Sequence, residues 1–249
     1  MRLIQRIALA AVFVVAILSA GATLRAQSLL TDALSWFPPS TTALEYSRPA
    51  TLRGLSNYES LRARFLGRNL KTLESSLAKL GIHEEDIDEM VLGWQSGAGK
   101  EMKYEGVALG RFDPARTAQQ AAASGIKPHT VAGLKAYCFA SDPNSSCVSV
   151  IDNSLGVFGP LPALESMLKA RSGNGPSVAA NTQFTDLARA AQTDAPIWGV
   201  ALGQAVSKWF KAWMPGEKNL QMDWASAFKD VSALSYQIEA EDNVHLDVK

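Results

Sequence analysis

The segments IDEMVLGWQ (residues 87–95) and YEGVALGRF (residues 104–112) decide the expected fold. Each is a short run rich in apolar, strand-forming residues, and the glycine-rich stretch Ser96–Lys100 between them is typical of a turn. Together they predict a β-hairpin. Asp113–Pro114 follows directly, and this pair is a typical helix start, so we expect a helix to about Ser124.

Outward from this hairpin, the expected elements follow the β-α-β-β-α-β order of a ferredoxin-like unit. Before the hairpin, residues 42–48 predict a strand, and residues 56–80 predict a long helix with one apolar stripe that ends at Gly81. After the hairpin and its helix, residues 130–139 predict another strand. We therefore expect an α+β fold in which residues 41–145 form a first ferredoxin-like repeat.

The remaining chain predicts a connecting hairpin and helix over residues 146–175 and a second repeat over residues 176–249. Asp86-Ile87-x-x-Met90 and Asp230-Val231-x-x-Leu234 resemble each other, which supports an internal duplication. The second repeat lacks residues for its last helix and strand. Either the chain is a piece of a longer one, or its C-terminal hairpin (residues 231–239 and 244–248) pairs with a second copy or a protein partner.

The first 26 residues have the features of a secretory signal peptide, in which a basic start precedes an apolar run over residues 7–20. Ala20-Gly21-Ala22 and Leu24-Arg25-Ala26 are two possible cleavage patterns. The second is less regular at its first position, but it lies next to the polar start of the mature chain, so we favour cleavage after Ala26. The alternative is an uncleaved N-terminal anchor. The uncharged run ends at Arg25, and its length is only about the minimum of roughly 18 residues that a spanning helix needs, which favours cleavage over anchoring.

We therefore expect a periplasmic or secreted protein with no stable membrane span after cleavage. Residues 27–40 would form a lead-in helix and linker. Removing residues 1–26 takes Arg2, Arg6 and Arg25 from the 24 basic residues and none from the 24 acidic ones, which leaves a net charge of −3. Nucleic-acid binding requires a basic surface, so nucleic acid is not an expected partner.

Cys138 and Cys147 are the only cysteines, and they flank a run with the Asp-Pro-Asn-Ser composition of a turn. Strand-like residues lie on both sides, so the two cysteines are expected at facing positions of a hairpin. In an oxidising compartment such a pair predicts a structural disulfide. The alternative is a redox or metal pair, but C-x-x-C spacing and a neighbouring histidine are both missing.

No catalytic, cofactor or metal site is expected. Gly97–Lys100 is not a phosphate loop, because Trp94 and Glu101 stand where that motif needs glycine and serine or threonine. Gly93–Gly97 lacks the serine position of a nucleophile elbow. The acidic run from His83 to Glu89 lacks the spacing of a calcium or zinc site, and a solvated turn is the simpler interpretation.

Two further features leave alternatives open. The aromatic cluster Trp209, Phe210 and Trp213 is either core or, if exposed, a partner or membrane-interface patch. The histidines His83, His129 and His245 lie in unrelated elements, so a hydrolase site can be assembled from them only by the fold.

Five segments carry a family resemblance, and they are Gly110–Asp113, Gly133–Tyr137, Ile151–Gly159, Pro176–Asn181 and Ala195–Trp198. With them the chain resembles exported bacterial proteins of uncharacterised function, of the kind found in acidobacteria. The resemblance covers about residues 40–200 and implies an extracytoplasmic domain of ferredoxin-like α+β repeats with no assigned activity.

Two functional classes follow from these observations. The favoured one is a non-enzymatic exported module that acts through surface interactions in the cell envelope or outside it, with a protein partner or self-association through the C-terminal hairpin. The alternative is a hydrolase with an unfamiliar site that contains one of the histidines.

Overall fold

A computed structural model describes residues 29–65, 74–95, 103–140, 145–203, 205–206, 226, 229–240 and 244–249. The expected signal peptide, the turn Ser96–Lys100 and the aromatic cluster around Trp209 lie outside these ranges. Of the helix expected over residues 56–80, the described parts are helical at 58–65 and at 74–78. In the described part of the chain, no helix combines the length and the apolar character needed to cross a membrane.

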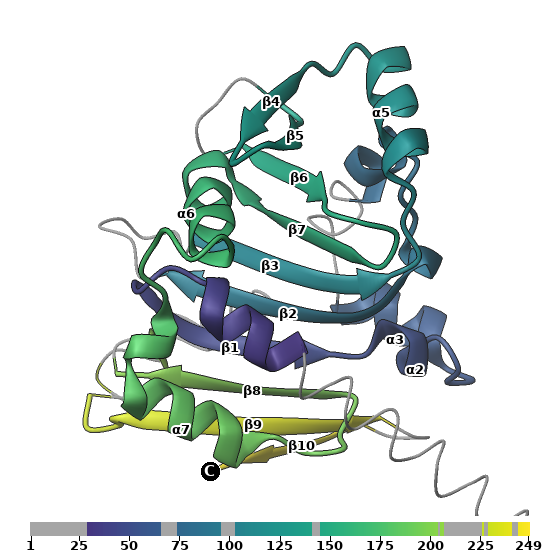
Figure 1. The fold of residues 1–249 in the computed structure, drawn as a ribbon. Coiled ribbons are helices and arrows are strands. Elements are labelled where there is room, and N and C mark those ends of the chain that lie inside the picture. The colour runs from purple at the N-terminus through teal and green to yellow at the C-terminus, as the bar shows by residue number, and fades with distance from the viewer. Residues whose placement is uncertain are drawn as a thin grey trace, which may run out of the picture.

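The described strands form one ten-stranded antiparallel sheet, which confirms the α+β class (Figure 1). Its strand order is β10-β9-β8-β1-β2-β3-β7-β6-β5-β4. The strands are β1 (Thr41–Ser47), β2 (Ile87–Gln95), β3 (Lys103–Gly110), β4 (Pro128–Val131), β5 (Leu134–Cys138), β6 (Ser146–Val150), β7 (Leu155–Pro160), β8 (Ile197–Leu202), β9 (Ala233–Ala240) and β10 (Val244–Val248).

The ferredoxin-like repeat is not confirmed, because β1 pairs directly with β2 in antiparallel orientation. A split β-α-β unit would instead place a third strand between two parallel ones. On its other side β1 pairs with β8, from the segment expected to form a second repeat. Strands from all three expected segments thus join one sheet. The physical reason is that β1 is a central strand, whose apolar side chains are buried only when strands on both of its sides widen the sheet.

The strand expected over residues 130–139 is in fact the hairpin of β4 and β5. Ala132 and Gly133 form its two-residue turn, with φ of 49° and 81°. Positive φ at both central positions is what a type I′ turn requires, and this turn matches the twist of the strands it joins. Alanine rarely adopts this conformation, so Ala132–Gly133 is a weak turn signal in sequence.

Helices lie mainly on one face of the sheet, which we call the inner face (Figure 1). They are residues 29–36, α6 (Leu161–Arg171) and α7 (Thr182–Ala191), and they pack across β6, β7, β8 and β9 as well as the middle of the sheet. The remaining helices lie near the ends of the strands. The bounds of the labelled helices are α2 (Pro49–Leu52), α3 (Tyr58–Phe65), η1 (Glu84–Asp86), α5 (Pro114–Ala123), α6 (Leu161–Arg171), η2 (Val178–Ala180) and α7 (Thr182–Ala191).

The main core lies between these helices and the inner face. Trp198 on β8 stacks on Tyr46 on β1 with ring centroids 5.5 Å apart, and Phe37 and Phe184 are fully buried beside the sheet. The opposite, outer face carries two smaller cores. One surrounds Tyr236 and Ile238 of β9 and the other surrounds Phe112 and Tyr137. Parts of both faces of the sheet are therefore buried, which explains why the strands contain more apolar residues than strands with one solvent-exposed face.

The same order of elements occurs twice in the sheet. Helix 29–36 precedes β1, β2 and β3, and α7 precedes β8, β9 and β10; in both units the three strands pair in chain order. The units meet where β1 pairs with β8, so β3 and β10 are each the strand of their unit that lies farthest from this junction. The matching sequences Asp86-Ile87 and Asp230-Val231 fall at the start of β2 and just before β9.

Candidate functional site

The three histidines do not come together. His83 precedes η1, where its main-chain N–H donates to the Asp86 carboxylate at 2.9 Å. His129 lies on β4 and His245 on β10, the two edge strands of the described sheet. Neighbouring strands are about 4.8 Å apart, so nine spacings separate these edges by roughly 40 Å in an extended sheet. A site that combines His129 with His245 is therefore excluded within one molecule.

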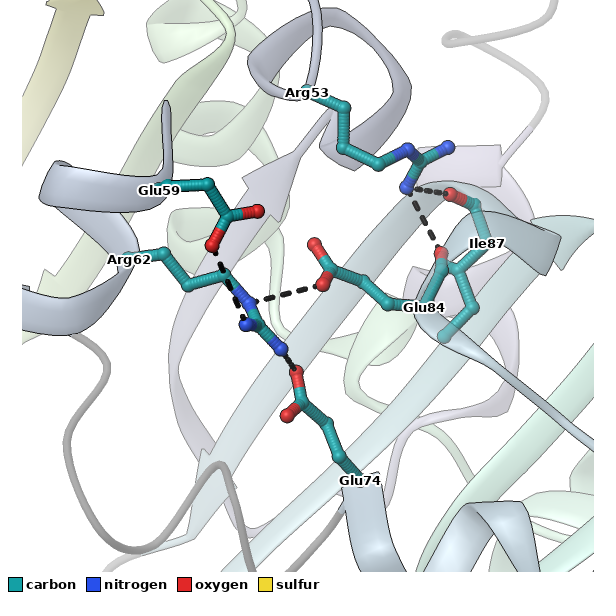
Figure 2. A network of polar contacts seen from close by, with 6 residues as sticks. All are labelled: Arg53, Glu59, Arg62, Glu74, Glu84 and Ile87. Carbon is teal, nitrogen blue, oxygen red and sulfur yellow. Dashed lines mark hydrogen bonds and ion pairs between the residues drawn. The ribbon is translucent and has the colours of Figure 1, made fainter. Parts of the chain in front are cut away.

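The acidic run before β2 serves as an anchor for arginines of the preceding helical segment (Figure 2). Arg62 on α3 forms ion pairs with Glu59, Glu74 and Glu84, and its Nε lies 3.0 Å from Oε2 of Glu84. Arg53 donates from Nη1 to the main-chain oxygens of Glu84 and Ile87, both at 2.9 Å. These contacts tie the connection after β1 to the start of β2.

The acidic run is not assembled as a metal site. Among the described residues, no three His, Cys, Asp or Glu side chains are grouped as ligands of a metal ion. Two of its acids, Glu84 and Asp88, face arginines instead. The run is therefore more than the expected solvated turn, since Glu84 and Asp88 also form ion pairs that only the tertiary fold brings about.

A cavity of about 150 Å³ lies where the end of β3 meets the first turn of α5. It contains two acids and two arginines, but its acids already accept main-chain hydrogen bonds: Asp113 from Ala115 and Arg116, and Asp86 from His83. None of the three histidines lines it, so it is not the histidine-containing site of the alternative interpretation. Its lining residues are Gly81, Ile82, Asp86, Arg111, Phe112, Asp113, Arg116, Thr117 and Asn153.

A fully buried carboxyl group lies on the inner face of the sheet. Glu105 on β3 receives hydrogen bonds from Thr41 Oγ1 at 2.6 Å and from Gln95 Nε2 at 2.7 Å. Ser40 in turn donates to Gln95 Oε1 at 2.7 Å. Burial raises the pKa of Glu105 to about 7, although the hydrogen bonds from Thr41 and Gln95 oppose the shift. Both hydrogen-bond donors are neutral, so no opposite charge among them offsets the desolvation of this carboxyl group.

A second carboxyl group links the two units of the sheet on the outer face. The Tyr236 hydroxyl on β9 donates to Glu45 on β1, reaching across β8 over Gly199. Burial raises the pKa of Glu45 to about 7, and the hydrogen bond from Tyr236 opposes the shift. Both glutamates thus connect strands, and neither lines the cavity described above. Sequence reasoning missed Glu105, although an acid within an otherwise apolar strand was an available signal.

Cys138 and Cys147 face each other directly across β5 and β6, with their sulfur atoms 2.02 Å apart. The neighbouring Phe139 N–H donates to the Ser146 oxygen, so the cysteines occupy a pair without mutual main-chain hydrogen bonds. Such pairs bring the Cα atoms closest, here to 4.0 Å. The expected cysteine pair is therefore present at bonding distance, and it fits an oxidising compartment.

The two edge strands of the described sheet differ in their capacity to accept another strand. β4 has four residues and begins with Pro128, which lacks a main-chain N–H. Short edges and proline are devices that prevent edge-to-edge pairing. β10 has five residues without proline, and Val248 on it is the one large hydrophobic side chain that is clearly exposed among the described residues, at 46%. Of the two edges of the described sheet, β10 is thus the more favourable one for pairing.

The register of β10 shows which of its main-chain groups point outward. Lys249 and Ser235 of β9 exchange both N–H···O bonds, at 2.9 and 3.0 Å. In an antiparallel ladder such pairs alternate with pairs that direct their N–H and C=O groups away from each other. Val244, Leu246 and Val248 therefore direct these groups to the side of β10 away from β9, where no described strand pairs with β10.

The equivalent strand of the other unit uses its outer side. β3 pairs there with β7 through four residue pairs, from Gly106↔Phe158 to Leu109↔Leu155. Its place in its own unit is that of β10 in the second unit. In the first unit, β3 therefore binds a further strand, β7, while it keeps its pairing with β2.

Comparison with known proteins gives a fold likeness only. No protein-family model and no curated protein matches the sequence. A solved structure described as crystal form I of TP0453 is similar, with a TM-score of 0.50 and 12% identity over 84% of this chain and 74% of that chain. Its crystal form IV gives a TM-score of 0.48 and 11% identity over 86% and 78% of the two chains.

Proposed function

We propose that this chain is an exported, non-enzymatic module that acts through surface contacts in the cell envelope or outside it. Its contact surface is the outer side of β10, to which a strand of a partner adds. The observation that carries the proposal is the row of outward main-chain groups at Val244, Leu246 and Val248. Strand addition of this kind is a common mode of protein recognition, since main-chain hydrogen bonds supply affinity without a deep pocket.

Three other features support the proposal. The paired cysteines fit a compartment outside the cytoplasm. The sequence resembles exported bacterial proteins without an assigned activity. The contrast between a protected edge at β4 and an unprotected edge at β10 indicates that pairing is directed to one side.

Site-specific photo-crosslinking in an exporting bacterial host tests the proposal. A photoreactive amino acid replaces Val248 at the open edge or, as the matched control, His129 at the protected edge. We expect covalent adducts from position 248 and none from position 129. Leu246→Pro should abolish the adducts, because it removes an outward N–H while leaving the pairing with β9 intact. Equal adducts from both positions, or adducts that persist in Leu246→Pro, would refute strand addition at β10.

A further inference from the structure

We infer that the strand added to β10 is β10 of a second copy of this chain, paired antiparallel around a two-fold axis at Leu246. The inference rests on the proposed function, since it names the partner of the same edge. In this arrangement Leu246 lies opposite Leu246 of the second copy, and Val244 lies opposite its Val248. The two sheets then continue into one another across the axis.

The spacing of the outward groups makes the edge complementary to itself. Val244, Leu246 and Val248 are two residues apart and symmetric about Leu246. An antiparallel two-fold pairing brings all three into hydrogen-bonded positions, which gives about six main-chain hydrogen bonds. A two-fold interface requires such self-complementarity, because the same surface serves on both subunits. The paired valines would also cover the exposed Val248.

Charge selects this register over its neighbours. With the axis at Leu246, position 245 faces position 247 of the second copy, so His245 and Asp247 are matched twice. Moving the axis to Asp247 places two aspartates directly opposite each other, which is destabilising. Moving it to His245 places histidine opposite histidine. Both shifts also reduce the main-chain hydrogen bonds to about four.

Engineered cysteines test the register directly, because the two native cysteines are already paired. Leu246→Cys places one thiol from each copy at the axis, where Cα atoms of a hydrogen-bonded pair are about 5.5 Å apart. This separation lies within the range of about 4.4 to 6.8 Å that a disulfide spans. Val248→Cys alone should not crosslink, since its nearest equivalent is four residues away, or about 13 Å. The double variant Val244→Cys/Val248→Cys should crosslink again.

The purified chain, analysed by light scattering and non-reducing mass spectrometry, should be a dimer that crosslinks in Leu246→Cys and in the double variant but not in Val248→Cys. His245→Asp should raise the dissociation constant of the dimer at least tenfold, because it places a second carboxylate opposite Asp247 of the second copy. Adding Asp247→Lys should restore the original affinity. Thermal melting of each variant verifies that it is folded. A monomer at all concentrations, or a dimer in which Leu246→Cys fails to crosslink, would overturn this inference. In the monomer case, adducts from position 248 with a different protein would still support the proposed function.

Discussion

Thr41 Oγ1 on β1 donates a hydrogen bond to the buried carboxyl group of Glu105 on β3, reaching across β2 over a distance of 2.6 Å. Gly93 on the intervening strand leaves room for this contact because it has no side chain. A Cβ at that position would lie 3.0 Å from Glu105 Oε1 and 2.8 Å from the Phe37 ring. Three strands are thus tied by one carboxyl group under the N-terminal helix.

This arrangement predicts a pH-dependent stability. The pKa of Glu105 is about 7 in the folded chain and 4.5 when the group is exposed. Between these values the folded state binds a proton that the unfolded state does not, so the free energy of unfolding falls as pH rises from 4.5 to 7. Since each pKa unit corresponds to about 1.4 kcal/mol, the expected loss is about 3 kcal/mol.

Urea unfolding at several pH values measures this loss. Glu105→Gln should remove about half of the slope between pH 4.5 and 7, because glutamine cannot ionise and Glu45 has a shift of similar size. The slope that remains should come from Glu45, whose pKa burial also raises to about 7. An unchanged slope in Glu105→Gln would show that this carboxyl is not protonated in the folded chain.

The bond between Cys138 and Cys147 should add about 2 to 3 kcal/mol to the free energy of unfolding, because it closes a short loop in the unfolded chain. We expect no uptake of an alkylating reagent by the purified chain without reductant, as read by mass spectrometry. The paired variant Cys138→Ala/Cys147→Ala should unfold at lower denaturant and remain folded in its absence. Two labels without reductant would contradict the assignment.

Two glycines in neighbouring strands should differ sharply in their tolerance of alanine. A Cβ on Gly106 would lie 2.1 Å from Cζ of Phe158, so the tip of this ring occupies the space that a side chain would need. Gly106→Ala should therefore displace the ring and cost about 1 to 3 kcal/mol. Gly156 is the matched control, since its nearest contact would be an ordinary 3.6 Å. Equal loss of stability in both variants would refute the steric explanation.

Local sequence identified several elements well. The strand over residues 87–95 agrees with β2, and the helix start at Asp113–Pro114 agrees with α5, whose first turn Asp113 caps through its carboxylate. The facing positions of Cys138 and Cys147 also followed from their turn. Such features depend on residues near each other in the chain, so periodicity and turn composition are enough to reveal them.

Strand order depended on the tertiary structure. Alternating apolar residues indicate that one face of a strand is buried, but they do not specify which strand lies beside it. The position of β1 between β2 and β8 could therefore not be predicted from the sequence. The burial of Glu105 and the anchoring of Arg62 likewise depend on residues many positions away.

By itself, then, the sequence determined the α+β class, the cysteine pair and the period of individual strands, because these are set by neighbouring residues. Only the tertiary structure decided that one sheet holds all described strands, that His129 and His245 lie at its opposite edges, and that β10 presents the main-chain groups of Leu246 outward. The physical reason is that sheet order and edges are fixed by burial of both faces across long sequence separations, which no local pattern records.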